Sequence, residues 1–189
     1  MRILGISGSL RRDSHNTSLL WAAARALPPG AELELLDGLA DVPPYDEDAD
    51  TEPGPAAVEH LRAQIEAADA VLIATPEYNA SIPGVLKNAI DWASRPFPDN
   101  ALRDKPVAVI GASTGLFGAL WAQAEVRKVL HHVGARVVDE ELPVGLAANA
   151  FTPEGALADP ELRQRFGELL EALTREVWAP LEAISAGSG

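Results

Sequence analysis

The sequence predicts an α/β fold in which helices cover both faces of a parallel β-sheet. Strand-like and helix-like segments alternate along the chain, which is the pattern of repeated strand–helix–strand units. The segment AVLIAT (70–75) is apolar throughout rather than alternating, as expected for a central strand buried on both faces. The chain has 189 residues, 47% of them apolar, which suits one domain with a sizeable core.

The first half of the chain contains three predicted strands and two predicted helices. RILGIS (2–7) is a short apolar run that ends in a glycine-rich turn, and a helical pattern at 17–27 follows that turn. ELELLD (32–37) is the second strand candidate. An acidic loop bracketed by prolines separates it from a helical pattern at 56–67, and AVLIAT (70–75) is the third strand.

The second half continues the alternation with two strands and three helices. Helical patterns at 83–94 and 118–133 flank the strand candidate VAVIGA (107–112). ARVVDEEL (135–142) is the fifth strand candidate, and a helical pattern at 160–178 ends the series.

Five strand–helix units favour one arrangement of the sheet. They predict a flavodoxin-like three-layer sandwich with a five-stranded parallel sheet of order 2-1-3-4-5, rather than the six strands of a full dinucleotide-binding fold. We expect a single domain over residues 1–184 and a disordered tail at 185–189, because the chain ends in small residues and shows no domain boundary or internal repeat.

Composition excludes several classes of function. The formal net charge of −13 argues against binding nucleic acid or an anionic membrane, because both require clustered Lys and Arg. No apolar stretch approaches the roughly 18 residues of a membrane span, and the first residues lack the features of a signal peptide, so we expect a cytoplasmic protein. The absence of cysteine excludes disulfides, thiolate metal sites and a cysteine nucleophile. The histidines show no metal-ligand spacing, so no metal site is expected.

In an open parallel sheet, ligands bind beyond the carboxyl ends of the strands, where the winding direction reverses. Three loops are therefore expected to form the site, namely those that follow the first, third and fourth strands. They begin with SGSLRRDSHNTS, TPEYNASIPG and GASTGLFG.

The first loop is rich in groups that bind phosphate. It lacks the dinucleotide fingerprint and the P-loop motif, but it offers several hydroxyls, an amide and two arginines before a predicted helix. Short polar side chains and free N–H groups at a helix start can hold a terminal phosphate, and an arginine adds charge-assisted hydrogen bonds. The structural alternative is that Ser14 or Asn16 simply caps the helix.

The second loop joins the buried strand to a helix with Ser81 as a candidate cap and Pro83 in its first turn. A turn at this place can present backbone N–H and C=O groups to the edge of a flat heterocycle. Structural alternatives are that Tyr78 is a packing aromatic and Glu77 a solvated carboxylate.

Taken together, GSLRRDSHN, ADAVLIATPEYNASIPGVLKNAIDW and GASTGLFG resemble the NADPH-dependent FMN reductase family, which includes flavodoxin-like quinone and azo-dye reductases. The resemblance covers residues 2 to about 138. It implies that the domain binds FMN, uses NADPH or NADH as electron donor and forms a homodimer or a tetramer, with the flavin near the partner chain. It also implies three groups of contacts: Ser9, Arg11, Ser14, Asn16, Thr17 and Ser18 for the phosphate, Pro76, Glu77, Tyr78 and Asn79 for the isoalloxazine, and Ser113, Thr114 and Gly115 for the other end of the ring.

The chemistry permitted by the residues agrees with this resemblance. A nicotinamide delivers hydride to the flavin, and two electrons then pass to a small acceptor such as a quinone, azo compound, free flavin or metal oxyanion. No dedicated catalytic acid or base is required. Because donor and acceptor must use the same open face of the ring, we predict ping-pong turnover. An electron carrier or flavin-binding regulatory module without nicotinamide turnover is the alternative.

A serine hydrolase is a further alternative, because GASTG (111–115) matches the nucleophile elbow G-x-S-x-G with Ser113 as nucleophile. The order of the chain disfavours it. The last histidines, His131 and His132, share one predicted helix with Glu125, the intervening acid, so they cannot readily supply separate triad partners. Phe117, Leu120, Trp121 and Ala124 form an apolar stripe on that helix, for which burial in the core is the default interpretation. Together with Trp92, the stripe is also a candidate dimer interface.

Overall fold

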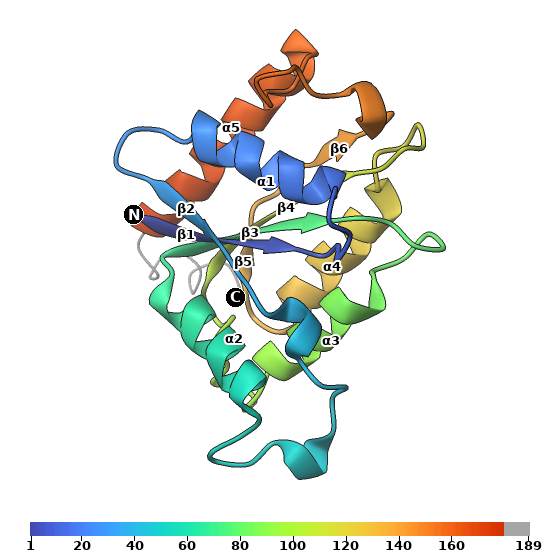
Figure 1. Cartoon of the computed structure of the whole chain (residues 1–189). Helices are drawn as coiled ribbons and strands as arrows, with labels where there is room; N and C mark the ends of the chain where they lie inside the picture. Colours follow the sequence, from blue (N-terminus) through green and yellow to red (C-terminus); the bar gives the residue numbers. More distant parts are fainter. Residues whose placement is uncertain (180–189) are drawn as a thin grey trace, which may run out of the picture.

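A computed structural model of the chain describes residues 1–179, so the predicted tail at 185–189 lies outside the described part. One sheet runs through the molecule, with every strand parallel to its neighbours. Its order is β2-β1-β3-β4-β5, which confirms the predicted order (Figure 1). The strands are β1 (Arg2–Ser7), β2 (Glu32–Leu35), β3 (Ala70–Thr75), β4 (Pro106–Ala112), β5 (Arg136–Val137) and β6 (Leu142–Val144).

The fifth predicted strand, 135–142, differs from the structure because it is divided into β5 and β6, which both pair with β4 and give a six-stranded sheet. Arginine side chains bind the carbonyls between the two pieces. Arg127 Nη1 donates to the carbonyl oxygen of Asp139 at 2.6 Å, and Arg165 Nη2 donates to that of Glu141 at 3.1 Å. The carbonyl groups of Asp139 and Glu141 therefore have arginine side chains, and not a neighbouring strand, as hydrogen-bond partners.

The helices form a layer on each face of the sheet, as predicted. Figure 1 shows α1 and α5 on one face and α2, α3 and α4 on the other, and each group covers its own apolar core. β3 and β4 lie between the two cores with every residue buried, which explains their apolar sequences. The helices are α1 (His15–Ala26), α2 (Ala56–Ala67), α3 (Gly84–Ala93), α4 (Leu120–His132) and α5 (Pro160–Trp178), with short 3₁₀ turns at Leu39–Asp41, Glu47–Ala49 and Ala147–Asn149.

The interpretation of Trp92 as part of an interface is wrong, because its side chain is 0% exposed. Its indole nitrogen donates to the carbonyl oxygen of Pro43 at 2.8 Å, and the Tyr45 ring meets it edge-on at 4.9 Å. The loop after β2 therefore folds over this face of α3. Nearby, Asp50 accepts a hydrogen bond from Arg62 at 2.8 Å, so this carboxylate of the acidic loop is paired.

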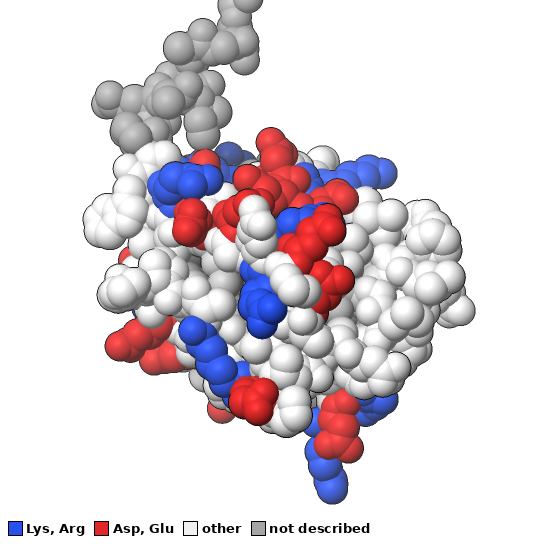
Figure 2. Space-filling view, turned by 90° about the horizontal axis from the view of Figure 1, so that it is seen from above, with Lys and Arg blue, Asp and Glu red and all other residues white. Residues whose placement is uncertain are grey.

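Charged side chains of both signs lie interspersed on the face seen in Figure 2, and the end of the molecule on the right of that view carries few of them. The same end carries the loops after β3 and β4 in Figure 1. Over residues 1–179, no helix combines the length and the apolar character that crossing a bilayer requires.

Candidate functional site

A cavity of about 200 Å³ opens where the carboxyl ends of β1, β3 and β4 meet. The sheet changes winding direction between β1 and β3, so this is the position at which open parallel sheets bind ligands. All three expected loops contribute to its walls. The lining residues are Ser9, Arg11, Ser14, His15, Asn16, Pro76, Glu77, Tyr78, Ala112, Ser113 and Thr114.

The first loop turns directly into α1. Ser14 is the N-cap of that helix, and its Oγ accepts hydrogen bonds from the N–H groups of Asn16 at 3.2 Å and Thr17 at 3.3 Å. Ser14 therefore both caps α1 and lines the cavity. Thr17 and Ser18 do not line the cavity: Thr17 Oγ1 lies 2.8 Å from Ser7 Oγ, and the Ser18 hydroxyl donates to the Ser14 carbonyl oxygen at 3.1 Å.

Asn16 ties the first loop to the third. Its side chain is buried, its Nδ2 donates to the carbonyl oxygen of Ala112 at 3.0 Å, and its Oδ1 accepts from the Ala112 N–H at 2.9 Å. The two bonds join the start of α1 to the last residue of β4, 96 positions away in sequence. Asn16 thus fixes the distance between two walls of the cavity.

The second loop contains a tight turn. Tyr78 and Ser81 exchange backbone hydrogen bonds at 3.2 and 3.1 Å, and the two residues between them, Asn79 and Ala80, have φ of 54° and 58°. Two consecutive left-handed residues are typical of a type I′ turn, which directs the loop back sharply. Tyr78 lines the cavity with its side chain half exposed, whereas Asn79 lies at the exposed tip of the turn.

The third loop is held by the segment that follows β6. The N–H of Ser113 donates to the Val144 carbonyl oxygen at 3.1 Å, and the Ser113 carbonyl oxygen accepts from Ala147 at 3.0 Å. The Leu146 N–H donates to the Gly115 carbonyl oxygen at 2.9 Å. Ser113 and Thr114 line the cavity, and Gly115 lies just outside it.

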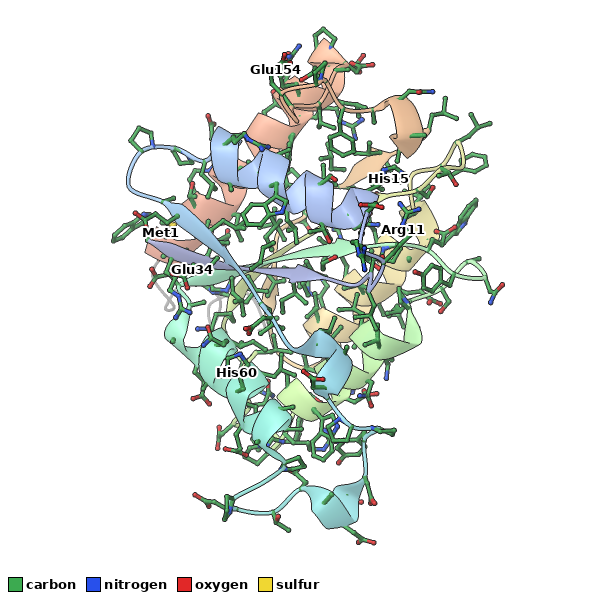
Figure 3. The ribbon with its side chains drawn as sticks, in the orientation of Figure 1. Met1, Arg11, His15, Glu34, His60 and Glu154 are labelled. Carbon is green, nitrogen blue, oxygen red and sulfur yellow. The ribbon has the colours of Figure 1, made fainter. Side chains whose placement is uncertain are left out.

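Arg11 and His15 are the two basic residues of the cavity wall. Figure 3 shows both at the end of the sheet where the loops gather, and both line the cavity. Burial and the neighbouring Arg11 charge lower the pKa of the His15 imidazole from its usual value of 6.5. Both effects disfavour the protonated imidazole, and Arg11 is the one Arg or Lys residue of the described chain that lines the cavity. Glu77 is the acidic one, and its carboxylate accepts hydrogen bonds from the backbone of α4.

Most residues predicted for the site therefore lie around one cavity. Four of them, Thr17, Ser18, Asn79 and Gly115, do not line it. Two further residues, His15 and Ala112, line the cavity but were not among the predicted site residues. The position of His15, between Ser14 and Asn16, was the available signal for the first of these.

The arrangement offers binding groups rather than a nucleophile with its base. Hydroxyls, a guanidinium and a helix start can hold an anionic group, while strand-end backbone and the flat Pro76–Tyr78 stretch can border a ring. Ser113 Oγ has one hydrogen bond in the described chain, as a donor to the Gly115 carbonyl oxygen at 3.5 Å. That is not the histidine partner of a hydrolase serine.

Comparison with known proteins identifies the family of the chain. The model of the family "NADPH-dependent FMN reductase" matches residues 1–149. An NAD(P)H-dependent FMN reductase of Pseudomonas aeruginosa is 45% identical over 179 residues, which cover 94% of this chain and 95% of that protein. A quinone reductase of Escherichia coli K12 is 40% identical over 156 residues, or 82% of each chain.

A solved structure extends the similarity to three dimensions. The flavoenzyme NAD(P)H:(acceptor) oxidoreductase FerB from Paracoccus denitrificans superposes with a TM-score of 0.81 at 37% identity, covering 94% of this chain and 97% of that one. The matches include the segments that form the cavity. The chain therefore belongs to the NADPH-dependent FMN reductase family, whose members are oxidoreductases that use FMN and a nicotinamide.

Proposed function

We propose that the cavity holds FMN with its phosphate on the first loop and its isoalloxazine between the second and third loops. The donor set supports this orientation, because the Ser9 and Ser14 hydroxyls, the Arg11 guanidinium and the start of α1 converge on one wall. These are the groups that bind a phosphate monoester. The one carboxylate on the wall, that of Glu77, is turned to the N–H groups of α4.

The size of the cavity supports a flavin that is only partly enclosed. Its volume of about 200 Å³ is below the roughly 300–1,000 Å³ that usually buries a whole ligand. One face of the ring is then open to a second flat molecule. Tyr78, Leu116 and Phe117 are more than half exposed and provide apolar surface for that molecule or for a partner chain.

Bound FMN supplies the redox chemistry, accepting a hydride from the nicotinamide and giving two electrons to the acceptor. The residues of the chain bind and orient the ring, and no acid or base in the cavity is needed to move a proton. Since donor and acceptor compete for one open face, the nicotinamide leaves before the acceptor enters. We propose a quinone as the first acceptor class to test, because relatives at 40% identity are named quinone reductases.

Phosphate recognition by Arg11 tests the proposed orientation. Replacing Arg11 by Ala should raise the dissociation constant for FMN about tenfold, through loss of a charge-assisted hydrogen bond, and should leave that for riboflavin unchanged. Arg12→Ala is the matched control, since Arg12 is also exposed but does not line the cavity. Calorimetry on the FMN-free protein measures both. Equal losses from the two variants would contradict the orientation.

The same preparation tests turnover. Anaerobic addition of NADPH or NADH should bleach the flavin absorption of the loaded protein, and steady-state rates with varied nicotinamide and quinone should give parallel double-reciprocal lines. Intersecting lines would show a ternary complex and exclude the ping-pong order.

We also propose that the chain forms a homodimer through the surface beside the cavity, with a tetramer as a further level of assembly. Leu116, Phe117 and Trp121 are exposed there, and the rings of the last two meet edge-on at 5.1 Å. Phe117→Asp should convert the dimer to a monomer in light scattering. Trp21→Asp, a change to an equally apolar exposed residue of α1, should leave the dimer intact. A wild-type mass of one chain would refute the proposal.

A further inference from the structure

Helix α4 begins without a capping side chain of its own. Its N-cap residue, Ala119, has φ of 62° and no side-chain hydrogen bond to the helix. The first N–H groups of a helix have no partners within it, so they require acceptors from elsewhere. The carboxylate of Glu77 supplies one: its Oε2 accepts from the N–H of Trp121 at 3.0 Å and from that of Ala122 at 3.1 Å.

This cap comes from a distant part of the sequence, 44 residues before Trp121. Glu77 lies in the loop after β3, between Pro76 and Tyr78, and it lines the cavity. A negative charge at a helix start also interacts favourably with the helix dipole. The contact therefore joins one wall of the cavity to α4, the helix that follows the third loop.

A second contact fastens the same loop to the same helix. The Ser81 hydroxyl donates to Glu125 Oε2 at 2.5 Å, one turn further along α4. Ser81 closes the tight turn that begins at Tyr78. The loop is thus attached to α4 at two points, one on each side of the turn, and Glu77 is the attachment nearer the cavity.

We propose that Glu77 is a positioning residue, whose carboxylate sets the spacing between the loop after β3 and the turn before α4, and thereby the slot for the isoalloxazine. This inference deepens the proposed function and rests on it. Glu77 acts through the backbone of α4. The loop itself presents its backbone, at Pro76 to Tyr78, to the ring.

Hydrogen exchange on the FMN-free protein tests the cap directly. Glu77→Ala should speed exchange of the Trp121 and Ala122 amides about tenfold, within the range of capping energies. Glu77→Gln retains an acceptor oxygen, so it should restore slow exchange to within about threefold of the wild type. Unchanged exchange in Glu77→Ala would overturn the proposed cap.

Positioning is separated from stability by a matched control in α5. Asp159 caps that helix in the same way, with Oδ1 accepting from Glu161 at 2.8 Å and Leu162 at 3.2 Å, but it does not line the cavity. Glu77→Ala should raise the FMN dissociation constant about tenfold and Glu77→Gln by less than about threefold. Asp159→Ala should lower the melting temperature similarly without changing FMN affinity.

The results distinguish a failure of the positioning role of Glu77 from a failure of the proposed function. If the wild type binds FMN and Glu77→Ala binds it equally well, or if Asp159→Ala weakens binding as much, the positioning role is wrong and the proposed function stands. If the wild type binds no FMN, the proposed function fails first, and the exchange data then describe a helix cap with no part in a flavin slot.

Discussion

Replacing Asn16 by Ala should lower the free energy of unfolding by about 3 kcal/mol and should weaken FMN binding as well. The side chain is 3% exposed and pairs with both backbone groups of Ala112, itself 2% exposed. Truncation leaves a buried N–H and a buried C=O without partners, at roughly 1–3 kcal/mol each. Urea unfolding of the FMN-free protein measures the loss, and calorimetry with FMN measures the effect on the site.

A second variant on the same helix controls for general effects near the first loop. Ser18 lies two residues after Asn16, is exposed, and donates only to the Ser14 carbonyl oxygen at the helix start. Ser18→Ala should change stability by no more than about 0.5 kcal/mol. If Asn16→Ala is as stable as Ser18→Ala, the pair between α1 and β4 does not hold the two loops together.

The place of Asn16 shows what the sequence could and could not predict. Its position after the first strand predicted that it would lie near the other strand-end loops, because the topology of a parallel sheet brings strand ends together, and it lines the cavity with them. Its partner could not be predicted, because Ala112 is a small apolar residue whose backbone carries no sequence signal. The sequence therefore predicted which residues lie close together. Which of them hold the loops in place could be seen only in the structure.

Glu77 and the fifth strand illustrate the same limit. Local sequence gave Glu77 two readings, a ring contact or a solvated carboxylate, and the structure shows a third, a cap on a helix more than 40 residues away. The segment 135–142 has the composition of one strand, but Arg127 and Arg165 bind carbonyls in its middle and divide it. Long-range hydrogen bonds to the backbone determine both the role of Glu77 and the division of this strand, and the local sequence pattern does not predict such bonds.

Helices and strands with strong local patterns were predicted well because their apolar residues are the ones that the fold buries. β3 and β4 are apolar at every position since both faces are covered, and α1 begins where Ser14 provides a cap. Trp92 was the exception. The loop at Pro43 covers its side of the helix, so this candidate interface residue is fully enclosed within the chain.

Gly145→Ala, a change in the segment that packs against the third loop, should lower the free energy of unfolding by about 2–3 kcal/mol. A Cβ at Gly145 would stand 2.2 Å from the Leu116 carbonyl oxygen and 2.9 Å from its carbon, both of which are backbone atoms that cannot rotate away. The turn would have to move off the segment after β6, and the hydrogen bond from Leu146 to Gly115 would be stretched or lost.

Gly115→Ala isolates this effect, because the two glycines face each other across the same contact. A Cβ at Gly115 would have Ser113 Oγ as its nearest neighbour, at 3.7 Å, which is ordinary van der Waals distance. That variant should unfold within about 0.5 kcal/mol of the wild type, whereas Gly145→Ala should also bind FMN more weakly, since Ser113 and Thr114 leave the cavity wall when the turn shifts. Chemical unfolding and FMN calorimetry on both variants decide the matter. Equal stability of the two would mean that the third loop tolerates displacement, and a rigid turn would then no longer explain how the proposed flavin slot keeps its width.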